Sequence, residues 1–236
     1  MELSDGLGRS LRLLEFRTGT GLGFTVLIDR AFDICEVEYR GRSIGWHGPS
    51  GVRHPGLHDY ASEGGFSWGR SFSGFLVTCG LDHIAGPETV KAYTYNCPNI
   101  PTNSHGLNGR LSTIRAKLTG YGERLKGDRC ILWAEGQVRQ AATFGKQLTL
   151  FGRNEVDLGD HDIRLSDRVQ NTGVLPTPDM SFYHINISAP LLAEGTRYLA
   201  PIPDVICAAH TDRYEPQGVG YQHVPAPQDG FAERDW

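Results

Sequence analysis

Alternation of apolar and polar residues dominates the chain, whereas the three- and four-residue spacing of an amphipathic helix is hard to find. Because side chains of a strand point alternately to opposite faces, this pattern predicts strands that are buried on one side. Gly, Pro, Asn and Asp separate the alternating segments, as expected of turns. The segments that we expect to form strands are 11–16, 23–28, 34–39, 75–78, 113–118, 130–138, 147–152, 163–170 and 180–187.

The segment 130–138 shows the alternation most clearly. One of its predicted faces contains Leu132, Ala134, Gly136 and Val138 and has no charged side chain, so we expect the strand to be half buried. No repeat, low-complexity tract or linker divides the chain. We therefore predict an all-β fold, a single antiparallel β-sandwich domain over residues 1–236.

The stretch between Trp46 and Phe72 breaks the pattern, since it is irregular and rich in Gly, His and Pro. It is too long for an ordinary connection. Loops of this length inside a compact domain are usually functional. We expect this stretch to contribute to a binding site.

Composition excludes several classes of protein. The net charge is −4, and the 23 Lys and Arg residues are scattered, so nucleic acid is not an expected partner. The chain has five cysteines at wide spacings without a C-x-x-C pair, as in a reduced, cytoplasmic protein. No apolar run approaches the ~20 residues of a membrane span, and the N-terminus does not resemble a signal peptide. We expect neither membrane insertion nor secretion.

Two histidines are the main candidates for acid–base chemistry, because imidazole both gives and takes protons near neutral pH. His105 precedes Gly106, and the missing side chain allows a ligand to come close to the imidazole. His184 lies in an apolar and aromatic strand, where it would be costly to bury without a partner. Each has a structural alternative: His105 as a loop residue bonded to a carbonyl, and His184 as a core residue with one hydrogen bond.

Other polar residues could assist a sugar site. Trp68 could stack on a sugar ring and Arg70 could donate to hydroxyls, although such pairs also pack at ordinary surfaces. Asn186 shares a predicted strand face with His184, and Arg110 ends the segment that begins with Ser104. For Asp29, Arg30 and Asp33 we prefer a structural salt bridge at a turn.

Metal and nucleotide chemistry have little support in the sequence. His47, His54 and His58 lie in the irregular stretch, but their spacing matches no standard metal site. The chain has no G-x-S-x-G, Rossmann or Walker motif. We therefore predict no metal and no cofactor, and keep a metal-dependent enzyme that uses these loop histidines as a minor alternative.

The ordered set of these segments resembles the aldose 1-epimerase (galactose mutarotase) superfamily, and within it a bacterial branch designated DUF4432. The resemblance covers nearly the whole chain and rests on segments 28–34, 45–46, 74–81, 104–106 and 182–186. It implies a β-supersandwich that binds a sugar and interconverts its anomers by acid–base ring opening. By this resemblance His184 is the general acid, His105 orients the ring and its hydroxyls, and Arg70, Asn186, Trp68 and Arg110 contact the substrate.

The chain departs from that superfamily near its end. The resemblance places the catalytic glutamate beyond a segment that matches Glu233, so we expect the sandwich to lack its last strands. An unpaired edge would favour association with another chain, a second copy included. An active isomerase and a non-catalytic carbohydrate-binding module or inactive fragment both remain open at this point.

Overall fold

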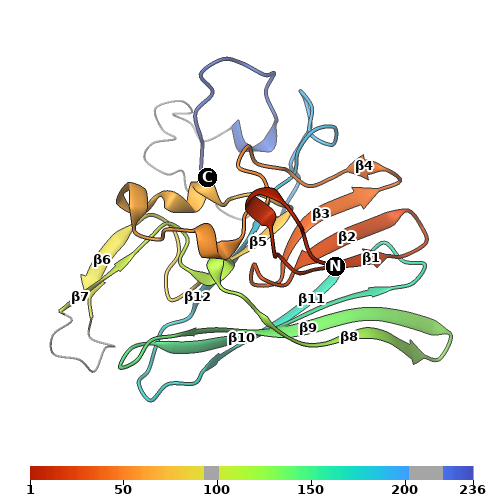
Figure 1. Ribbon diagram of the computed structural model, residues 1–236. Helices are drawn as coiled ribbons and strands as arrows, with labels where there is room; N and C mark the ends of the chain where they lie inside the picture. Colours follow the sequence, from red (N-terminus) through yellow and green to blue (C-terminus); the bar gives the residue numbers. More distant parts are fainter. Residues whose placement is uncertain (93–100, 202–219, 236) are drawn as a thin grey trace. The chain divides into compact units, whose positions relative to one another are not determined.

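The computed structural model describes residues 1–92, 101–201 and 220–235 (Figure 1). The chain divides into two compact units, Met1–Ile187 and Ser188–Trp236. In the described part of the second unit, a 3₁₀ helix, η7 (Gly220–Gln222), accompanies an antiparallel bridge between Arg197 and His223. That the whole chain folds as a single domain stays a prediction.

The first unit contains a six-stranded antiparallel sheet with the order β1-β2-β3-β5-β12, in which β4 also pairs with β3. Apolar side chains on both faces of β2 and β5 bury these strands in its centre. Cross-strand contacts fix the register, as where the rings of Phe16 and Phe24 stack at 4.4 Å between their centroids. The strands are β1 (Leu13–Arg17), β2 (Leu22–Leu27), β3 (Asp33–Tyr39), β4 (Arg42–Ser43), β5 (Leu76–Leu81) and β12 (Met180–Ile185).

A second, four-stranded sheet has the order β11-β10-β9-β8, and a separate hairpin pairs β6 with β7 (Figure 1). These strands are β6 (Glu88–Lys91), β7 (Thr102–His105), β8 (Lys117–Lys126), β9 (Arg129–Ala141), β10 (Gln147–Asp157) and β11 (Arg164–Asn171). The helices described in this unit are short 3₁₀ turns. They are η1 (Gly6–Gly8), η2 (Pro55–Leu57), η3 (Ser62–Gly65), η4 (Ser67–Arg70) and η5 (Leu111–Thr113).

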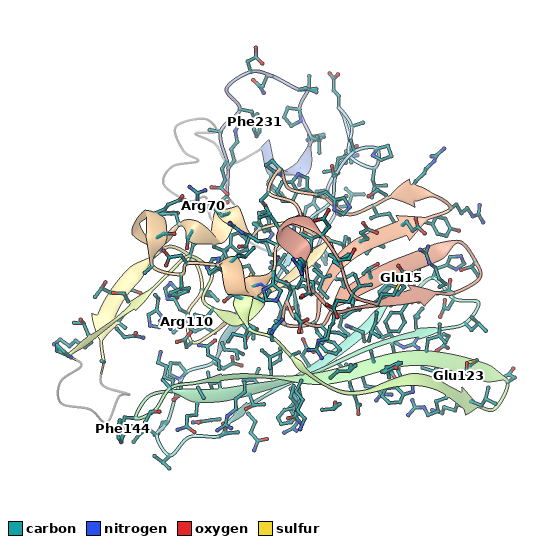
Figure 2. All side chains as sticks on the ribbon, viewed as in Figure 1. Glu15, Arg70, Arg110, Glu123, Phe144 and Phe231 are labelled. Atoms are coloured by element: carbon teal, nitrogen blue, oxygen red, sulfur yellow. The ribbon has the colours of Figure 1, made fainter. Side chains whose placement is uncertain are left out.

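The main core lies between the two large sheets, where side chains from both fill the space (Figure 2). Phe24, Val26 and Ile34 come from the first sheet, and Val138 and Leu150 from the second. The ring of Phe32 packs on Gly136 of β9 so closely that a Cβ there would lie 2.4 Å from it. The predicted all-β sandwich is confirmed.

Alternation located most strands but failed in two places. The buried residues Ala134, Gly136 and Val138 confirm the drier face of 130–138. The predicted strand 113–118 is wrong, because η5 ends at Thr113 and β8 begins at Lys117. Most of β8 is exposed on an outer edge of its sheet and carries polar residues, so it has no alternating pattern. For the same reason the hairpin β6–β7 was not predicted.

The irregular stretch between Trp46 and Phe72 covers the other face of the first sheet. Val52 packs with Leu13, Leu27 and Cys35 in a small cluster on that face. Trp68 packs with Val77 and Cys79 in another. The stretch is thus packed against the first sheet at Val52 and at Trp68. Tyr60 and η3 lie between these two residues in the sequence.

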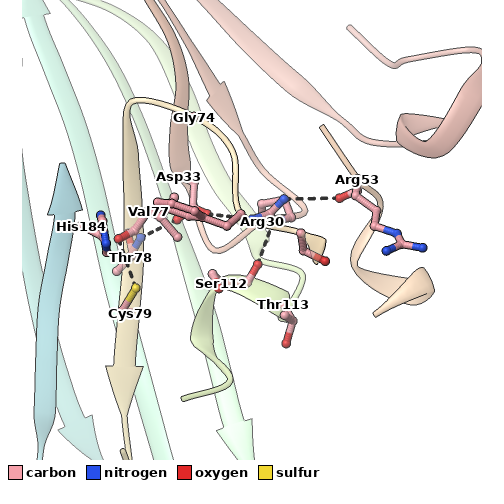
Figure 3. A network of polar contacts seen from close by, with 12 residues as sticks. Arg30, Asp33, Arg53, Gly74, Val77, Thr78, Cys79, Ser112, Thr113 and His184 are labelled. Atoms are coloured by element: carbon pink, nitrogen blue, oxygen red, sulfur yellow. Dashed lines mark hydrogen bonds and ion pairs between the residues drawn. The ribbon is translucent and has the colours of Figure 1, made fainter. Parts of the chain in front are cut away.

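A buried ion pair connects the strands to this stretch (Figure 3). Arg30 Nη2 lies 3.7 Å from Asp33 Oδ2, and both side chains are 2% exposed. Arg30 Nε donates to Ser112 O at 2.9 Å and Nη1 to Arg53 O at 3.5 Å. Asp33 Oδ1 accepts from the Thr78 amide at 2.8 Å. The preferred interpretation of the Arg30 turn as a salt bridge is confirmed, although the pair lies in the interior.

Two further expectations concern the environment of the protein. Among the described residues, no helix has the length and apolar character to cross a membrane. Cys35, Cys79 and Cys130 are free thiols, whereas Cys97 and Cys207 lie outside the described residues.

Replacing Arg30 with Met should reduce the free energy of unfolding by about 3–5 kcal/mol, because it leaves the Asp33 carboxylate buried without its cation. Burial raises the pKa of Asp33 to about 7, and Arg30 lowers it. Without Arg30 this pKa rises further, so the loss should grow as the pH rises from 5 to 8. Urea unfolding at both pH values measures it.

The matched control is Arg17→Met, which removes the exposed pair of Arg17 with Glu38 on the same sheet. Such surface pairs contribute only about 0–1 kcal/mol. A loss for Arg30→Met no larger than the control, or one that shrinks toward pH 8, contradicts the structural role of the pair.

Candidate functional site

The candidate site forms where the end of β5 meets the segment that follows β7. Gly80 and Gly109 pair as a parallel bridge, and the Gly80 amide donates to Asn108 O at 3.0 Å. A Cβ on Gly109 would lie 2.5 Å from His83 O, and Gly109 also has a φ of +72°. Glycine is therefore needed at this approach, which brings the residues after β5 against those around His105.

Asp82 and His105 face each other in this junction. Asp82 Oδ2 lies 3.6 Å from His105 Nδ1, and their side chains are 5% and 2% exposed. Asn103 Nδ2 lies 3.1 Å from His105 Nε2 and can only donate, so a neutral imidazole carries its proton on Nδ1, toward Asp82. Asp82 Oδ1 and His105 Nδ1 have no hydrogen-bond partner. Buried polar atoms without partners are rare, and a water molecule or a polar ligand would satisfy them.

His83 holds the imidazole of His105 from one side. The two rings stack at 4.8 Å between centroids, and His83 Nε2 is bonded to Gly86 O at 2.7 Å. Burial lowers the pKa of His105, as do the charges of Lys146 and Arg110, whereas Asp82 raises it. His105 is therefore neutral at pH 7.

Tyr60 and Arg110 also line the site. The Tyr60 hydroxyl accepts from the Gly106 amide at 2.6 Å, and the Arg110 guanidinium lies over the Tyr60 ring at 4.3 Å. Arg110 Nη2 also donates to Ser104 O at 3.3 Å, while its buried Nε has no partner. The irregular stretch thus supplies Tyr60 to the lining of the candidate site.

Three adjoining cavities share these side chains. The His105 cavity, of 690 Å³, is lined by Tyr60, Asn103, His105 and Arg110 among others. A second, the Arg139 cavity, has 390 Å³ and shares Tyr60 and Arg110 with the first. A small one of 180 Å³ adjoins Asp82, His105 and Lys146. The two larger volumes are within the roughly 300–1,000 Å³ of small-molecule sites.

His184 lies in a different environment. Its ring contacts Phe72, Trp68 and Phe182 at centroid distances of 4.8, 5.7 and 6.2 Å. It pairs with Val77 on β5, and Val77 is about 13 Å from the end of that strand at roughly 3.3 Å per residue. His184 does not line the cavities that contain His105. The structure thus does not bring the two imidazoles together.

The other residues predicted to contact the substrate are also separated, some near His184 and one near His105. Trp68 is buried beside His184, and its Nε1 donates to Ser112 Oγ at 3.3 Å. Asn186 donates to Gly74 O at 2.8 Å and so ties β12 to the chain before β5. Arg70 is exposed, pairs with Glu63, and lies apart from Arg110 (Figure 2). Of the predicted set, only Arg110 accompanies His105.

Asp82, His83, Tyr60 and Lys146 were not singled out from the sequence. A usable signal existed for Asp82 and His83, which directly follow the apolar run of β5 and its Gly80, where a buried strand ends. For Tyr60 and Lys146, no pattern in the neighbouring sequence indicates that they line the site. They reach the site only through the folding of distant segments.

The described residues contain no group of three or more His, Cys, Asp or Glu side chains that could hold a metal ion. His54 and His58 are engaged elsewhere, His54 with Arg115 and the Gly56 amide, and His58 with Ser71. Nothing in this part of the chain favours the metal-dependent alternative.

Two solved structures resemble the chain. A putative aldose 1-epimerase from Klebsiella pneumoniae matches with a TM-score of 0.86 and 22% identity, over 98% of this chain and 57% of that one. The Slr1438 protein from Synechocystis sp. PCC 6803 matches with a TM-score of 0.52 and 11% identity, over 79% and 58%. The chain thus spans a little over half the length of each. No curated protein matches the sequence.

These likenesses concern the fold, and they agree with the β-sandwich that the sequence predicted. A family model also matches, that of the domain of unknown function DUF4432, over residues 8–236. Since this match covers nearly the whole sequence, the chain belongs to the DUF4432 family and has an aldose 1-epimerase-like fold.

Proposed function

We propose that the chain binds a sugar at the Asp82–His105 pair and interconverts its anomers by opening and closing the ring. The observation that carries the proposal is a buried carboxylate beside a buried imidazole, each with an unpartnered polar atom, at the junction of the cavities. Sugar hydroxyls are donors and acceptors that would satisfy both atoms. The fold shared with the Klebsiella protein, described as a putative aldose 1-epimerase, supports the same chemistry.

Asp82 is the group that moves the proton. Its carboxylate takes the proton from the anomeric hydroxyl, the C1–O bond of the ring breaks as a carbonyl forms, and the same proton passes to the ring oxygen. Both oxygens are attached to C1, so one carboxylate can reach them in turn. Rotation about the C1–C2 bond and the reverse transfer close the ring on the other face, and Asp82 is regenerated.

His105 orients the substrate, in the role that the resemblance to the aldose 1-epimerase superfamily implies. Its neutral Nδ1–H can donate to a sugar oxygen held beside Asp82. His184 was the expected general acid, but its aromatic surroundings and its position about 13 Å along β5 give it no evident path to the same ring. The two schemes therefore make opposite predictions for His184.

Replacing Asp82 with Asn should lower the rate of anomer interconversion by about 10²–10⁴-fold, because the amide cannot accept the proton. His105→Asn should weaken turnover, and His184→Asn should leave most of it. Polarimetry on freshly dissolved α-glucose and α-galactose measures each rate, with sugar binding measured alongside by calorimetry.

The matched control is Asp128→Asn, at an exposed turn position between β8 and β9. Loss of turnover in His184→Asn with full activity in Asp82→Asn would overturn the assignment in favour of the two-histidine scheme. Sugar binding without turnover in the wild-type chain would favour a non-catalytic carbohydrate-binding module.

The protonation of His105 gives an independent test. Because burial lowers its pKa, the imidazole should titrate below the usual value of about 6.5. Asp82→Asn removes a charge that raises this pKa, so the midpoint should fall further; Lys146→Gln removes one that lowers it, so the midpoint should rise. Proton NMR titration of the His105 ring checks both. A midpoint that moves in the same direction in both variants contradicts the geometry.

A further inference from the structure

The charge of the Arg139 cavity is opposite to that of the whole chain. The chain has a net charge of −4. Arg110, Arg139 and Lys146 nevertheless line this cavity, and Asp82 is the one acidic residue among its lining side chains. His58 also lines it, but burial lowers the pKa of His58, so it adds no charge at pH 7. The cavity therefore has an excess of positive charge.

The charge of these cations is not neutralised by a carboxylate among the described residues, although Lys146 Nζ donates to Asp82 O at 3.3 Å and Arg110 Nη2 donates to Ser104 O at 3.3 Å. In the part of the chain that the structure describes, no ion pair engages Arg110, Arg139 or Lys146, whereas several arginines elsewhere in the first unit are paired with carboxylates. Examples are Arg12 with Asp29, Arg124 with Glu155, Arg153 with Glu135 and Arg164 with Asp157. Unpaired cations that line one cavity attract an anion.

Other polar groups that line this cavity have atoms without a hydrogen-bond partner, which a ligand could supply. Gln140 is 9% exposed and its Oε1 has no hydrogen-bond partner, as is true of Asp82 Oδ1 and the Nε of Arg110. The Tyr60 ring holds the Arg110 guanidinium in place at 4.3 Å. The lining of the cavity thus combines unsatisfied groups, which suit hydroxyls, with oriented cations, which suit an anionic group.

We propose that the substrate is an anionic sugar, whose carboxylate or phosphate lies against Arg139, Arg110 and Lys146 in the Arg139 cavity. The hydroxyl-bearing ring extends to Asp82 and His105, since Asp82 lines both this cavity and the small one beside His105. This inference rests on the proposed function, because it assigns the substrate class of the same site. Arg139 and Lys146 then determine specificity and take no part in proton transfer.

Calorimetric titration with glucose, galactose, glucuronate, galacturonate and glucose 6-phosphate tests the proposal on the full chain. We expect an anionic sugar to bind at least about tenfold more tightly than its neutral counterpart, with a preference that weakens as salt is added. The two uronates and the phosphate separate a carboxylate from a phosphate as the favoured anion. In the double variant Arg139→Gln/Lys146→Gln, the ratio of anionic to neutral affinity should fall to near one.

The control is Arg124→Gln/Lys126→Gln, which removes the same charge from exposed positions of β8, near the opposite end of β9. This control should retain the full ratio of anionic to neutral affinity. A loss of the ratio in the control as well would mean that net charge, and not the cavity, causes the preference. Equal binding of neutral and anionic sugars by the wild-type chain, or a ratio unaffected by the double variant, overturns this inference and leaves the proposed function standing. If none of these sugars binds, both fail.

Discussion

The buried pair of Arg30 and Asp33 is the interaction on which the arrangement of the first unit depends. Asp33 begins β3 and accepts from the Thr78 amide of β5, while Arg30 donates to Ser112 O after the His105 segment and to Arg53 O in the irregular stretch. Charges in an interior are costly, and here each side chain faces the other at 3.7 Å and also binds backbone groups. These two side chains therefore connect β3 and β5 to Arg53 of the irregular stretch and to Ser112, which follows the His105 segment.

The candidate site forms at a close approach of backbone at Gly80 and Gly109. Without side chains there, the end of β5 lies against the segment after β7, and Asp82 is buried beside His105. Burial gives the pair its chemical character, since it leaves the imidazole neutral at pH 7 and keeps polar atoms unpaired. The surrounding cations, Arg110, Arg139 and Lys146, are the basis of the proposed preference for an anionic sugar.

The sequence predicted the fold better than the site. Strands with a face toward the core, such as β9, carry alternation because one side of the pleat must be apolar. β8 and the hairpin β6–β7 have few core contacts, so no pattern marked them. His105 and Arg110 were found together because they belong to one short segment. His184 was grouped with His105 because both imidazoles lie in predicted strand or turn segments suited to acid–base chemistry, and its role as general acid came from the resemblance, whereas its ring lies among Phe72, Trp68 and Phe182.

Local pattern was thus sufficient for an all-β sandwich, and it named the irregular stretch and His105 as candidates for the site. It could not identify the partners of His105. Asp82 and Lys146 lie far from it in the sequence, and hydrophobic periodicity reports which face of a strand is buried, not which distant side chains meet there. Contacts such as Asp82 with His105, and the gathering of Arg110, Arg139 and Lys146 around one cavity, arise only when the separate strands pack.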